Sequence, residues 1–302
     1  MKTCVIINPK AGSAEQVGVL EDALKRQDAI SCWQTAEAGD ARALAIKALQ
    51  DGFDRIVAAG GDGTISEVVN GMMGGGGAAT LGIIPLGPGN DLARTLALPN
   101  DPRDALALVL ADGHLPIDLI KATSGDRTVY GINAAAGGFT GQVNEIMTAE
   151  MKATWGPLAY LFGAASALPD LRDYRTHIAL DDEPEEAIDA FNVVIANGRS
   201  IGGGKRVAPH ANPMDGLLDV VIVKQAGALE LAGLAAKFAM GDHLGSPHVL
   251  YRCVKHIRVT SEPGMWFNVD GELLAKEPLT STVLPGALDV VVGSEFQPHP
   301  VG

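Results

Sequence analysis

The chain has 302 residues, of which 47% are apolar and 20% are charged, and its formal net charge is −13 at pH 7. This length and composition predict a globular protein of two domains, and the acidic balance argues against a nucleic acid partner, because phosphate neutralisation needs a basic surface. No apolar run reaches the roughly 18 residues of a membrane-spanning helix, and a strand begins so close to Met1 that no signal peptide is expected. Cys4, Cys32 and Cys253 have no metal-site spacing and are predicted to be buried free thiols in a reducing cytoplasm.

Short apolar strands alternate with helical patterns through the first third of the chain. That order is typical of a parallel sheet covered by helices, with ligand-binding loops at the carboxyl ends of its strands. Strands are predicted at Lys2–Asn8, Ile30–Gln34, Arg55–Ala59 and Leu81–Pro85, and helices at Ala14–Gln27, Asp40–Gln50, Ile65–Met73 and Asp91–Leu98.

The character of the sequence changes around residues 112–116, after which strand patterns dominate. We therefore expect an α/β domain over residues 1–122 and a β-rich domain, most simply a sandwich, over residues 123–286. Strands are predicted at Ile117–Ala122, Val129–Ala135, Arg175–Leu180, Phe191–Ala196, Leu217–Val223, Tyr251–Thr260, Trp266–Val269 and Leu288–Val292, and helices at Gly156–Leu168 and Ala228–Met240.

The segment Gly60-Gly61-Asp62-Gly63-Thr64 lies between a predicted strand and a predicted helix. Such a junction brings bare backbone N–H groups and the positive end of a helix up to an anion. The Asp62 carboxylate would repel a phosphate, so a cation is expected between them, and Mg²⁺ bound to a nucleotide is the natural candidate. The alternative is a glycine-rich turn in which Asp62 only caps the helix.

Two more glycine loops follow strands of the same predicted sheet. Leu86–Arg94 has Asn90 and Asp91 at a helix start, where either could be a simple N-cap worth about 1 kcal/mol. Two such junctions, each with a carboxylate, favour a cradle for a nucleotide and its metal. Asn8–Ser13 adds a third loop and the Lys10 ammonium, although Lys10 alone would be an ordinary surface lysine.

Together these motifs resemble the diacylglycerol kinase catalytic family, which groups bacterial lipid kinases with sphingosine and ceramide kinases. The set is highly specific in this order, and it covers nearly the whole chain. The first half contributes Asn8–Gly12, Thr35 with Gly39–Ala41, Gly60–Thr64 with Glu67 and Asn70-Gly71, and Pro85–Asp91. The second half contributes Asn133–Phe139, Gly156–Tyr160, Asn197-Gly198, Gly202–Gly204, Ala208-Pro209, Asp215-Gly216 and Asn268–Glu272.

The resemblance implies a phosphofructokinase-like or NAD-kinase-like α/β domain that binds ATP, completed by residues 287–302, and a β-sandwich domain that binds lipid. Asp270 would be the general base, with Glu272 beside it. The implied ATP contacts are Asn8, Lys10, Thr35, Gly60, Gly61, Asp62, Gly63, Thr64, Glu67, Gly89, Asn90 and Asp91. The implied metal ligands are Asp62, Asp91 and Asp118 for the active-site Mg²⁺, and Asn212, Asp215 and the Leu217 carbonyl for a structural Mg²⁺.

The local sequence at Asp270 supports a hairpin turn as well as it supports a catalytic base. Chemistry is favoured because phosphoryl transfer needs a carboxylate to accept the hydroxyl proton, and few other candidates exist. His210 and His243 could serve, but both lie among loop residues and are expected to face solvent. Asp118 is a lone carboxylate in an apolar strand, so a metal, water or another partner is expected beside it.

One position departs from the family pattern, since Pro88 stands where the family has Thr. Proline offers neither a hydroxyl nor an N–H to a phosphate. Loss of one hydrogen bond to a charged group costs about 1.5–3 kcal/mol, so we expect ATP affinity about ten- to a hundredfold weaker, or a shifted nucleotide preference.

We expect a Mg²⁺- and ATP-dependent lipid kinase at the inner face of the membrane, with a lipid and a second copy of the chain as partners. Gly202–Arg206 and the helix before Arg172 are expected to form its membrane-facing lip, the alternative being a core-packed helix. A kinase of a soluble substrate such as NAD stays open, since NAD kinases share the Gly-Gly-Asp-Gly loop. A non-catalytic nucleotide sensor also stays open, with Pro88 as its only hint.

Overall fold

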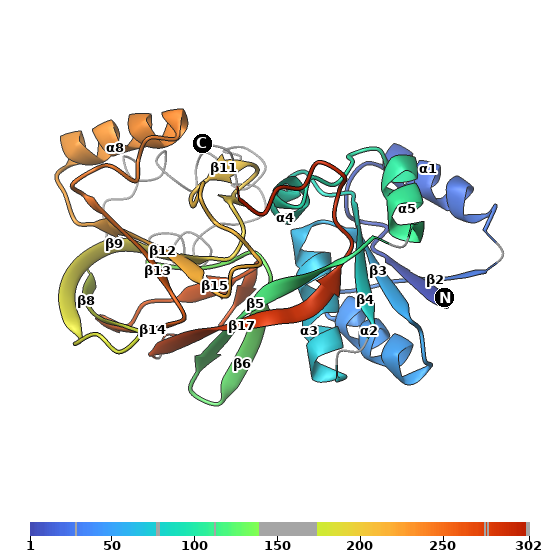
Figure 1. Ribbon diagram of the computed structural model, residues 1–302, viewed down its shortest axis with the longest axis horizontal. Coiled ribbons are helices and arrows are strands. Elements are labelled where there is room, and N and C mark those ends of the chain that lie inside the picture. The colour runs from blue at the N-terminus through green and yellow to red at the C-terminus, as the bar shows by residue number, and fades with distance from the viewer. Residues whose placement is uncertain are drawn as a thin grey trace.

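The computed structural model of the protein describes residues 1–27, 29–76, 79–111, 113–138, 174–274, 276 and 278–299. Figure 1 shows two halves side by side, one of helices around a parallel sheet and one of antiparallel strands with a helix lying over them. The helix expected over Gly156–Leu168 lies outside the described residues. No helix in the described ranges is both long enough and apolar enough to span a bilayer.

The first half has strands β2, β1, β3 and β4 in that order, all parallel. The predicted alternation is confirmed, and one helix was missed. That helix, α5, begins at Pro102 behind Asp101, whose side chain accepts from two backbone N–H groups, so Asp-Pro was the signal that could have found it. The elements are β1 (Thr3–Ile7), α1 (Ala14–Leu24), β2 (Ile30–Gln34), α2 (Asp40–Gln50), β3 (Arg55–Gly60), α3 (Asp62–Gly74), β4 (Thr80–Pro85), α4 (Asp91–Thr95) and α5 (Pro102–Leu110).

Strands β1, β3 and β4 of the parallel sheet are buried on both faces. In β1, Cys4 and Ile6 pack in the core formed with α2 and α3, whereas Val5 and Ile7 pack in the core formed with α1 and α5. This is why the strands are continuous apolar runs instead of alternating ones. Each aliphatic side chain fully buried in this way contributes about 1.5–3 kcal/mol, so the sheet is a rigid base for its loops.

The second half is β-rich and sandwich-like, as the sequence predicts. Two of the expected strands are each divided, one at Ile132–Asn133 and one at Lys255, and α8 has the predicted bounds. The elements are β5 (Leu115–Ser124), β6 (Arg127–Gly131), β7 (Ala134–Gly138), β8 (Tyr174–Leu180), β9 (Glu186–Ala196), β10 (Ser200–Ile201), β11 (Lys205–Arg206), β12 (Leu218–Lys224), α8 (Ala228–Met240), β13 (Val249–Val254), β14 (His256–Glu262), β15 (Phe267–Val269), β16 (Glu272–Leu273) and β17 (Leu279–Val290).

Strand β17 joins the two halves. Strand β17 pairs antiparallel with β14 and β5, and its C-terminal end pairs parallel with β4 through Val290 and Leu81. The chain then contacts the first half again, because the Gly293 N–H donates to Leu96 O at 2.9 Å. One hydrogen-bonded strand network therefore extends from β2 to β16.

Two of the three cysteines are not where the sequence predicts. Cys4 is buried, and burial raises the pKa of its thiol to about 12. Cys32 and Cys253 are exposed, so the prediction that they are buried was wrong. Both lie on edge strands, β2 and β13, where apolar neighbours in the sequence point to the opposite face.

Substitution of Gly293 by Ala tests the return of the chain to the first half. A Cβ at this position would lie 1.8 Å from Ala97 O, which is rigid backbone. We expect Gly293→Ala to lower the free energy of unfolding by about 1–3 kcal/mol in a denaturant titration. Gly18→Ala, in α1 with no atom near the added Cβ, should instead raise it by about 0.5–1 kcal/mol. Equal midpoints for the two variants would contradict the close contact.

Candidate active site

Three loops meet at the carboxyl edge of the parallel sheet, and they touch through backbone. A Cβ added to Gly12 would lie 2.0 Å from Leu86 O, and one added to Gly87 would lie 2.6 Å from the Cα of Gly61. Any side chain at Gly12 or Gly87 would collide with main chain, so these glycines are required for the approach. The loops after β1, β3 and β4 therefore form one continuous rim.

Side chains also connect the three loops. Asn8 Nδ2 donates to Thr64 Oγ1 at 3.1 Å, which fastens the first loop to the start of α3. Asp91 N–H donates to Asp62 Oδ1 at 3.0 Å, which fastens the third loop to the same helix. Lys10 Nζ donates to Ala36 O at 2.7 Å, which holds the exposed ammonium at the rim. Pro88 is exposed between Gly87 and Gly89.

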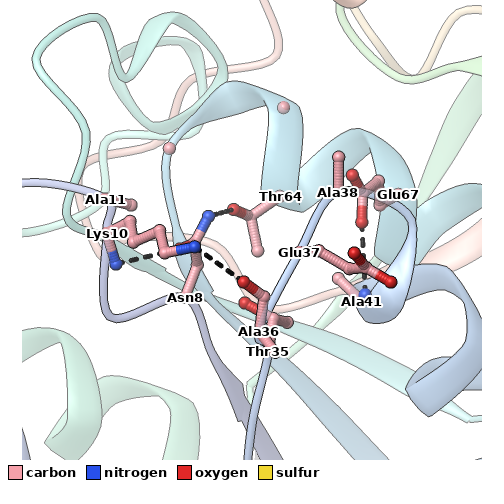
Figure 2. A pocket seen from close by; sticks show the side chains of 12 residues that line it. Asn8, Lys10, Ala11, Thr35, Ala36, Glu37, Ala38, Ala41, Thr64 and Glu67 are labelled. Carbon is pink, nitrogen blue, oxygen red and sulfur yellow. Dashed lines mark hydrogen bonds between the residues drawn. The ribbon is translucent and has the colours of Figure 1, made fainter.

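A pocket of about 330 Å³ opens between this rim and the start of α2 (Figure 2). Its volume lies at the lower end of the range for small-molecule sites. In Figure 2 the side chains of Asn8, Lys10 and Thr64 gather on one side, and Glu67 lies on the other. Seven of the twelve nucleotide contacts expected from the sequence line it, namely Asn8, Lys10, Thr35, Gly61, Gly63, Thr64 and Glu67.

Glu67 has a partner that the sequence did not reveal. Its two carboxylate oxygens accept from Gly39 N–H at 2.9 Å and Ala41 N–H at 3.2 Å. These donors belong to the N-terminus of α2, where a negative charge is stabilised by the helix dipole. Glu67 therefore links α3 to α2, and direct contact between Glu67 and a nucleotide stays a prediction.

Asp62 and Asp91 are brought together. Asp62 begins α3, and burial followed by the charge of Asp91 raises the pKa of its carboxyl. Both oxygens of Asp91 are engaged by the second half, accepting from Gly203 N–H at 2.9 Å and Gly204 N–H at 2.6 Å. Asn90, the residue before Asp91, is buried in a left-handed conformation, and its Oδ1 has no hydrogen-bond partner among the described residues. Asp62 and Asn90 thus bring largely buried oxygen atoms to this edge of the sheet.

The partners of Asp91 belong to the glycine run at residues 202–204, for which the sequence suggested another role. Gly202, Gly203 and Gly204 all have positive φ, so their N–H groups can converge on one carboxylate. The hairpin of β10 and β11 is tied to α4 in this way. The run of three glycines was the signal available in the sequence, and it was read there as part of a membrane-facing lip. The helix before Arg172, the other part of that lip, lies outside the described residues.

Asp270 occupies a two-residue turn between β15 and β16, with φ of 46° at Asp270 and 95° at Gly271. This is the hairpin that Asp-Gly predicts. The carboxylate is held by three backbone N–H groups: Oδ2 accepts from Ile132 at 2.6 Å and Asn133 at 3.1 Å, and Oδ1 from Ala134 at 2.7 Å. Burial nevertheless raises the pKa of Asp270 to about 6, and the charge of Asp62 contributes. Backbone N–H groups of residues 132–134 thus place the Asp270 carboxyl, and the charge of Asp62 acts on it from the first half.

A different pair of backbone N–H groups holds Asp118. Its oxygens accept from Gly216 N–H and Gly286 N–H, both at 2.7 Å, and its acidic neighbour is Asp215. Burial raises the pKa of the Asp118 carboxyl. The structure thus places the Asp118 carboxylate beside the 212–217 loop, and its role at a metal with Asp62 stays a prediction. The partner expected for a carboxylate in an apolar strand is a pair of backbone N–H groups.

In the loop expected to hold a structural Mg²⁺, side-chain oxygens accept hydrogen bonds from the backbone of the same loop. Asn212 Oδ1 accepts from Met214 N–H at 3.1 Å, and Asp215 Oδ1 accepts from Leu217 N–H at 3.0 Å. Side chains that bond to the backbone two residues on are typical of Asx-turns. Asn and Asp at these positions are thus explained by turn geometry, and the metal stays a prediction.

The other candidate proton acceptors have different surroundings. Glu272 pairs with Arg127 at 3.1 Å on the surface. His210 is exposed, as expected, but His243 is buried and its Nε2 lies 2.9 Å from Val207 O, so the expectation that it faces solvent was wrong. Leu234 and Phe238 of α8 pack in the same core cluster as Val207. Burial lowers the pKa of His243.

Two family models match the chain. Residues 2–122 match the diacylglycerol kinase catalytic domain, and residues 133–292 match the YegS C-terminal NAD kinase beta sandwich-like domain. Curated relatives named diacylglycerol kinase include one from Staphylococcus saprophyticus, 34% identical over 91% of this chain and 90% of the relative. Another, from Staphylococcus aureus, is 31% identical over 97% of this chain and 92% of the relative.

Solved structures agree on the fold. A diacylglycerol kinase from Bacillus anthracis superposes with a TM-score of 0.74 at 23% identity, over 98% of each chain. An NAD kinase from Archaeoglobus fulgidus, solved in complex with ATP, superposes with a TM-score of 0.56 at 13% identity, over 97% of this chain and 95% of its own.

A helix-covered parallel sheet with a glycine rim, joined to a sandwich that carries a buried carboxylate, defines a kinase with the NAD-kinase-like architecture. Within that class, the chain belongs to the diacylglycerol kinase family. Use of ATP follows at the level of the family.

Substitution of Gly87 by Ala tests the glycine rim. The added Cβ would push against the Cα of Gly61 and displace the start of α3. We expect Gly87→Ala to weaken ATP binding about tenfold in a calorimetric titration, because misplacement of a binding loop by a fraction of an ångström removes aligned contacts. Gly113→Ala, whose added Cβ meets open space, is the control and should bind ATP as the wild type does. Unchanged affinity in Gly87→Ala would show that the rim does not hold the nucleotide.

Proposed function

We propose that this protein transfers the γ-phosphoryl group of ATP to a hydroxyl of a diacylglycerol-like lipid at the inner face of the membrane. One observation carries the proposal: three backbone N–H groups hold the buried Asp270 carboxyl, and the charge of Asp62 at the glycine rim helps to raise its pKa, which supports a site that the rim and a candidate base share. In this proposal residues 1–122, completed by residues 287–302, bind the nucleotide, and residues 123–286 bind the lipid. The curated relatives named diacylglycerol kinase support the choice of acceptor.

The phosphates would lie against the rim. The N-terminus of α3 and the N–H groups of Gly61 and Gly63 offer a positive end to an anion. Lys10 adds an ammonium whose present acceptor, Ala36 O, is neutral and exchangeable for a phosphate oxygen. The rest of the nucleotide would extend along the pocket past Thr35 and Thr64.

The residues at the rim fit Mg²⁺. The orphaned Oδ1 of buried Asn90 and the Asp62 carboxylate are hard oxygen ligands, which this ion prefers. Within the described ranges no three His, Cys, Asp or Glu side chains form a metal cage, and Mg²⁺ commonly uses one or two carboxylates together with substrate phosphates. When bound there, the ion neutralises charge on the phosphates. Asp91 acts indirectly, by tying α4 to the Gly203 and Gly204 amides.

Asp270 would accept the proton of the lipid hydroxyl. A carboxylate oxygen accepts about two hydrogen bonds, and Oδ2 already accepts two. Oδ1 accepts only one from the described residues, from Ala134, so it keeps an acceptor position for the hydroxyl. A pKa raised to about 6 leaves the group ionised at neutral pH while making it a stronger base than an ordinary aspartate.

A soluble acceptor such as NAD is the second candidate, favoured by the fold shared with the Archaeoglobus NAD kinase. The two are separated by one experiment, in which purified protein and labelled Mg-ATP meet either diacylglycerol in mixed micelles or NAD without lipid. Label in the lipid supports the proposal, and label only in NAD overturns it. Tight ATP binding with no label in either acceptor would favour a nucleotide sensor.

Replacement of Asp270 by Asn should lower kcat for lipid phosphorylation by at least a hundredfold, because general-base catalysis contributes about 10²–10⁴-fold. The matched control is Glu272→Gln, two residues away and paired with Arg127 at the surface, which should keep kcat within about twofold. Circular dichroism checks folding, since the Asn amide group would face N–H donors at position 270. An Asp270→Asn variant that is folded and fully active would remove the proposed base.

The pH profile offers an independent check. Because the base must be ionised, kcat/KM should fall as pH falls through about 6, tenfold per pH unit below that point, and level off above it. An ordinary aspartate would place this limb near pH 4. A limb at pH 4, or none in the wild type, would contradict the assignment of Asp270.

A further inference from the structure

Asn70 is a buried amide in the middle of α3, only 1% exposed. Asparagine is a poor helix former, because its side chain competes for backbone hydrogen bonds. An amide in the core also costs free energy unless each polar atom finds a partner. A buried Asn in a helix interior therefore calls for a specific use of its hydrogen bonds.

The Asn70 amide is fully used, and mostly by the other half of the molecule. Its Nδ2 donates to Tyr130 O at 2.8 Å and to Ser66 O at 2.9 Å, while its Oδ1 accepts from Tyr130 N–H at 2.9 Å. Exchange of both an N–H and a C=O with one residue is what a neighbouring antiparallel strand would do. Tyr130 lies in β6, which pairs on its other edge with β5 and has no further strand partner among the described residues. Asn70 thus takes the place of a strand on the free edge of β6.

From Tyr130 the path to the candidate base is short. The next residue, Gly131, packs so closely that a Cβ there would lie 2.8 Å from Val269 Cγ1 and 3.5 Å from Asp270 Oδ2. The N–H groups of the three residues that follow are those that hold the Asp270 carboxylate. Displacement of β6 at Tyr130 would therefore displace those donors and the carboxylate with them.

From Asn70 the path to the nucleotide rim is a rigid helix. Asp62 is the first residue of α3, eight residues before Asn70, or about 12 Å along the helix axis. Figure 1 shows α3 at the junction of the two halves. The helix that carries the proposed phosphate site is thus fixed to the strand whose continuation holds the proposed base.

We infer that Asn70 is a positioning residue, which sets the placement of the Asp270 carboxylate relative to the nucleotide site by fixing α3 to β6. The inference rests on the proposed function, because it assigns Asp270 to the reaction. Asn70 touches neither the rim pocket nor Asp270, so its effect is on alignment and not on nucleotide binding. Alignment of reacting groups governs kcat, whereas ATP affinity depends on the residues of the rim pocket, which Asn70 does not line.

The test is Asn70→Leu, which fills a similar volume, favours the helix and removes all three hydrogen bonds. With diacylglycerol in mixed micelles, kcat should fall at least tenfold while KM for ATP stays within about twofold. Met72→Ala is the matched control, since Met72 is fully buried in the same helix and its truncation destabilises the fold without removing a hydrogen bond from Tyr130. It should lower the thermal midpoint and leave kcat close to that of the wild type.

Hydrogen exchange supplies a second readout that does not require turnover. A peptide spanning Tyr130–Ala134 should exchange at least tenfold faster in Asn70→Leu than in Met72→Ala, because the first amide loses its acceptor and the others lose their alignment. If Asn70→Leu does not fold, Asn70→Ala takes its place with the same expected direction in both measurements.

The outcomes separate this inference from the proposed function. An active wild type together with an Asn70→Leu variant of full kcat overturns the positioning role alone. A loss in Asn70→Leu that Met72→Ala reproduces also overturns it, since stability then explains the effect. A wild type that phosphorylates no lipid overturns the proposed function and, with it, any role for Asn70 in alignment.

Discussion

The candidate site depends on backbone approaching backbone at the rim of the parallel sheet. The loops after β3 and β4 meet at Gly87, where an added Cβ would lie 2.6 Å from the Cα of Gly61. The loop after β1 meets the loop after β4 at Gly12, where an added Cβ would collide with Leu86 O. Because glycine removes the Cβ at each contact, the three loops stack without side chains between them. Their N–H groups and the start of α3 can then converge on one ligand, which separate loops could not do.

The second half contributes through backbone amides as well. Asp91, Asp118 and Asp270 are each held by two or three N–H groups from turns and strand ends, with no lysine or arginine as the first partner. Such donors stabilise a carboxylate without neutralising it, so burial can still raise its pKa. At Asp270 the charge of Asp62 adds to the effect of burial on the pKa, and at Asp118 the charge of Asp215 does so. Backbone amides thus fix the position of these carboxylates, whereas burial sets the pKa of Asp118 and Asp270.

The sequence predicts the parts of this molecule whose signals are local. The alternation of strands and helices follows from buried apolar runs, and the Asp-Gly turn at Asp270 follows from the backbone conformation that such a turn requires. Long-range partners have no local signal. The grouping of Asp118 with Gly216 and Gly286 depends on a bulge in β17 that is far along the chain. The exposure of Cys32 and Cys253 depends on which strands become edges, and periodicity alone does not give strand order.

Strand β17 is synthesised long after the strand β4 with which it pairs, and this delay affects how the first half assembles. As a nascent chain leaves the ribosome, β1 to β4 can assemble early, but the outer edge of β4 has no strand beside it until residues 279–290 have been synthesised. An open strand edge is a template for pairing with another polypeptide. The first half is therefore most vulnerable to misassembly during the time that translation of the sandwich takes, and a slower passage through that region lengthens the exposure.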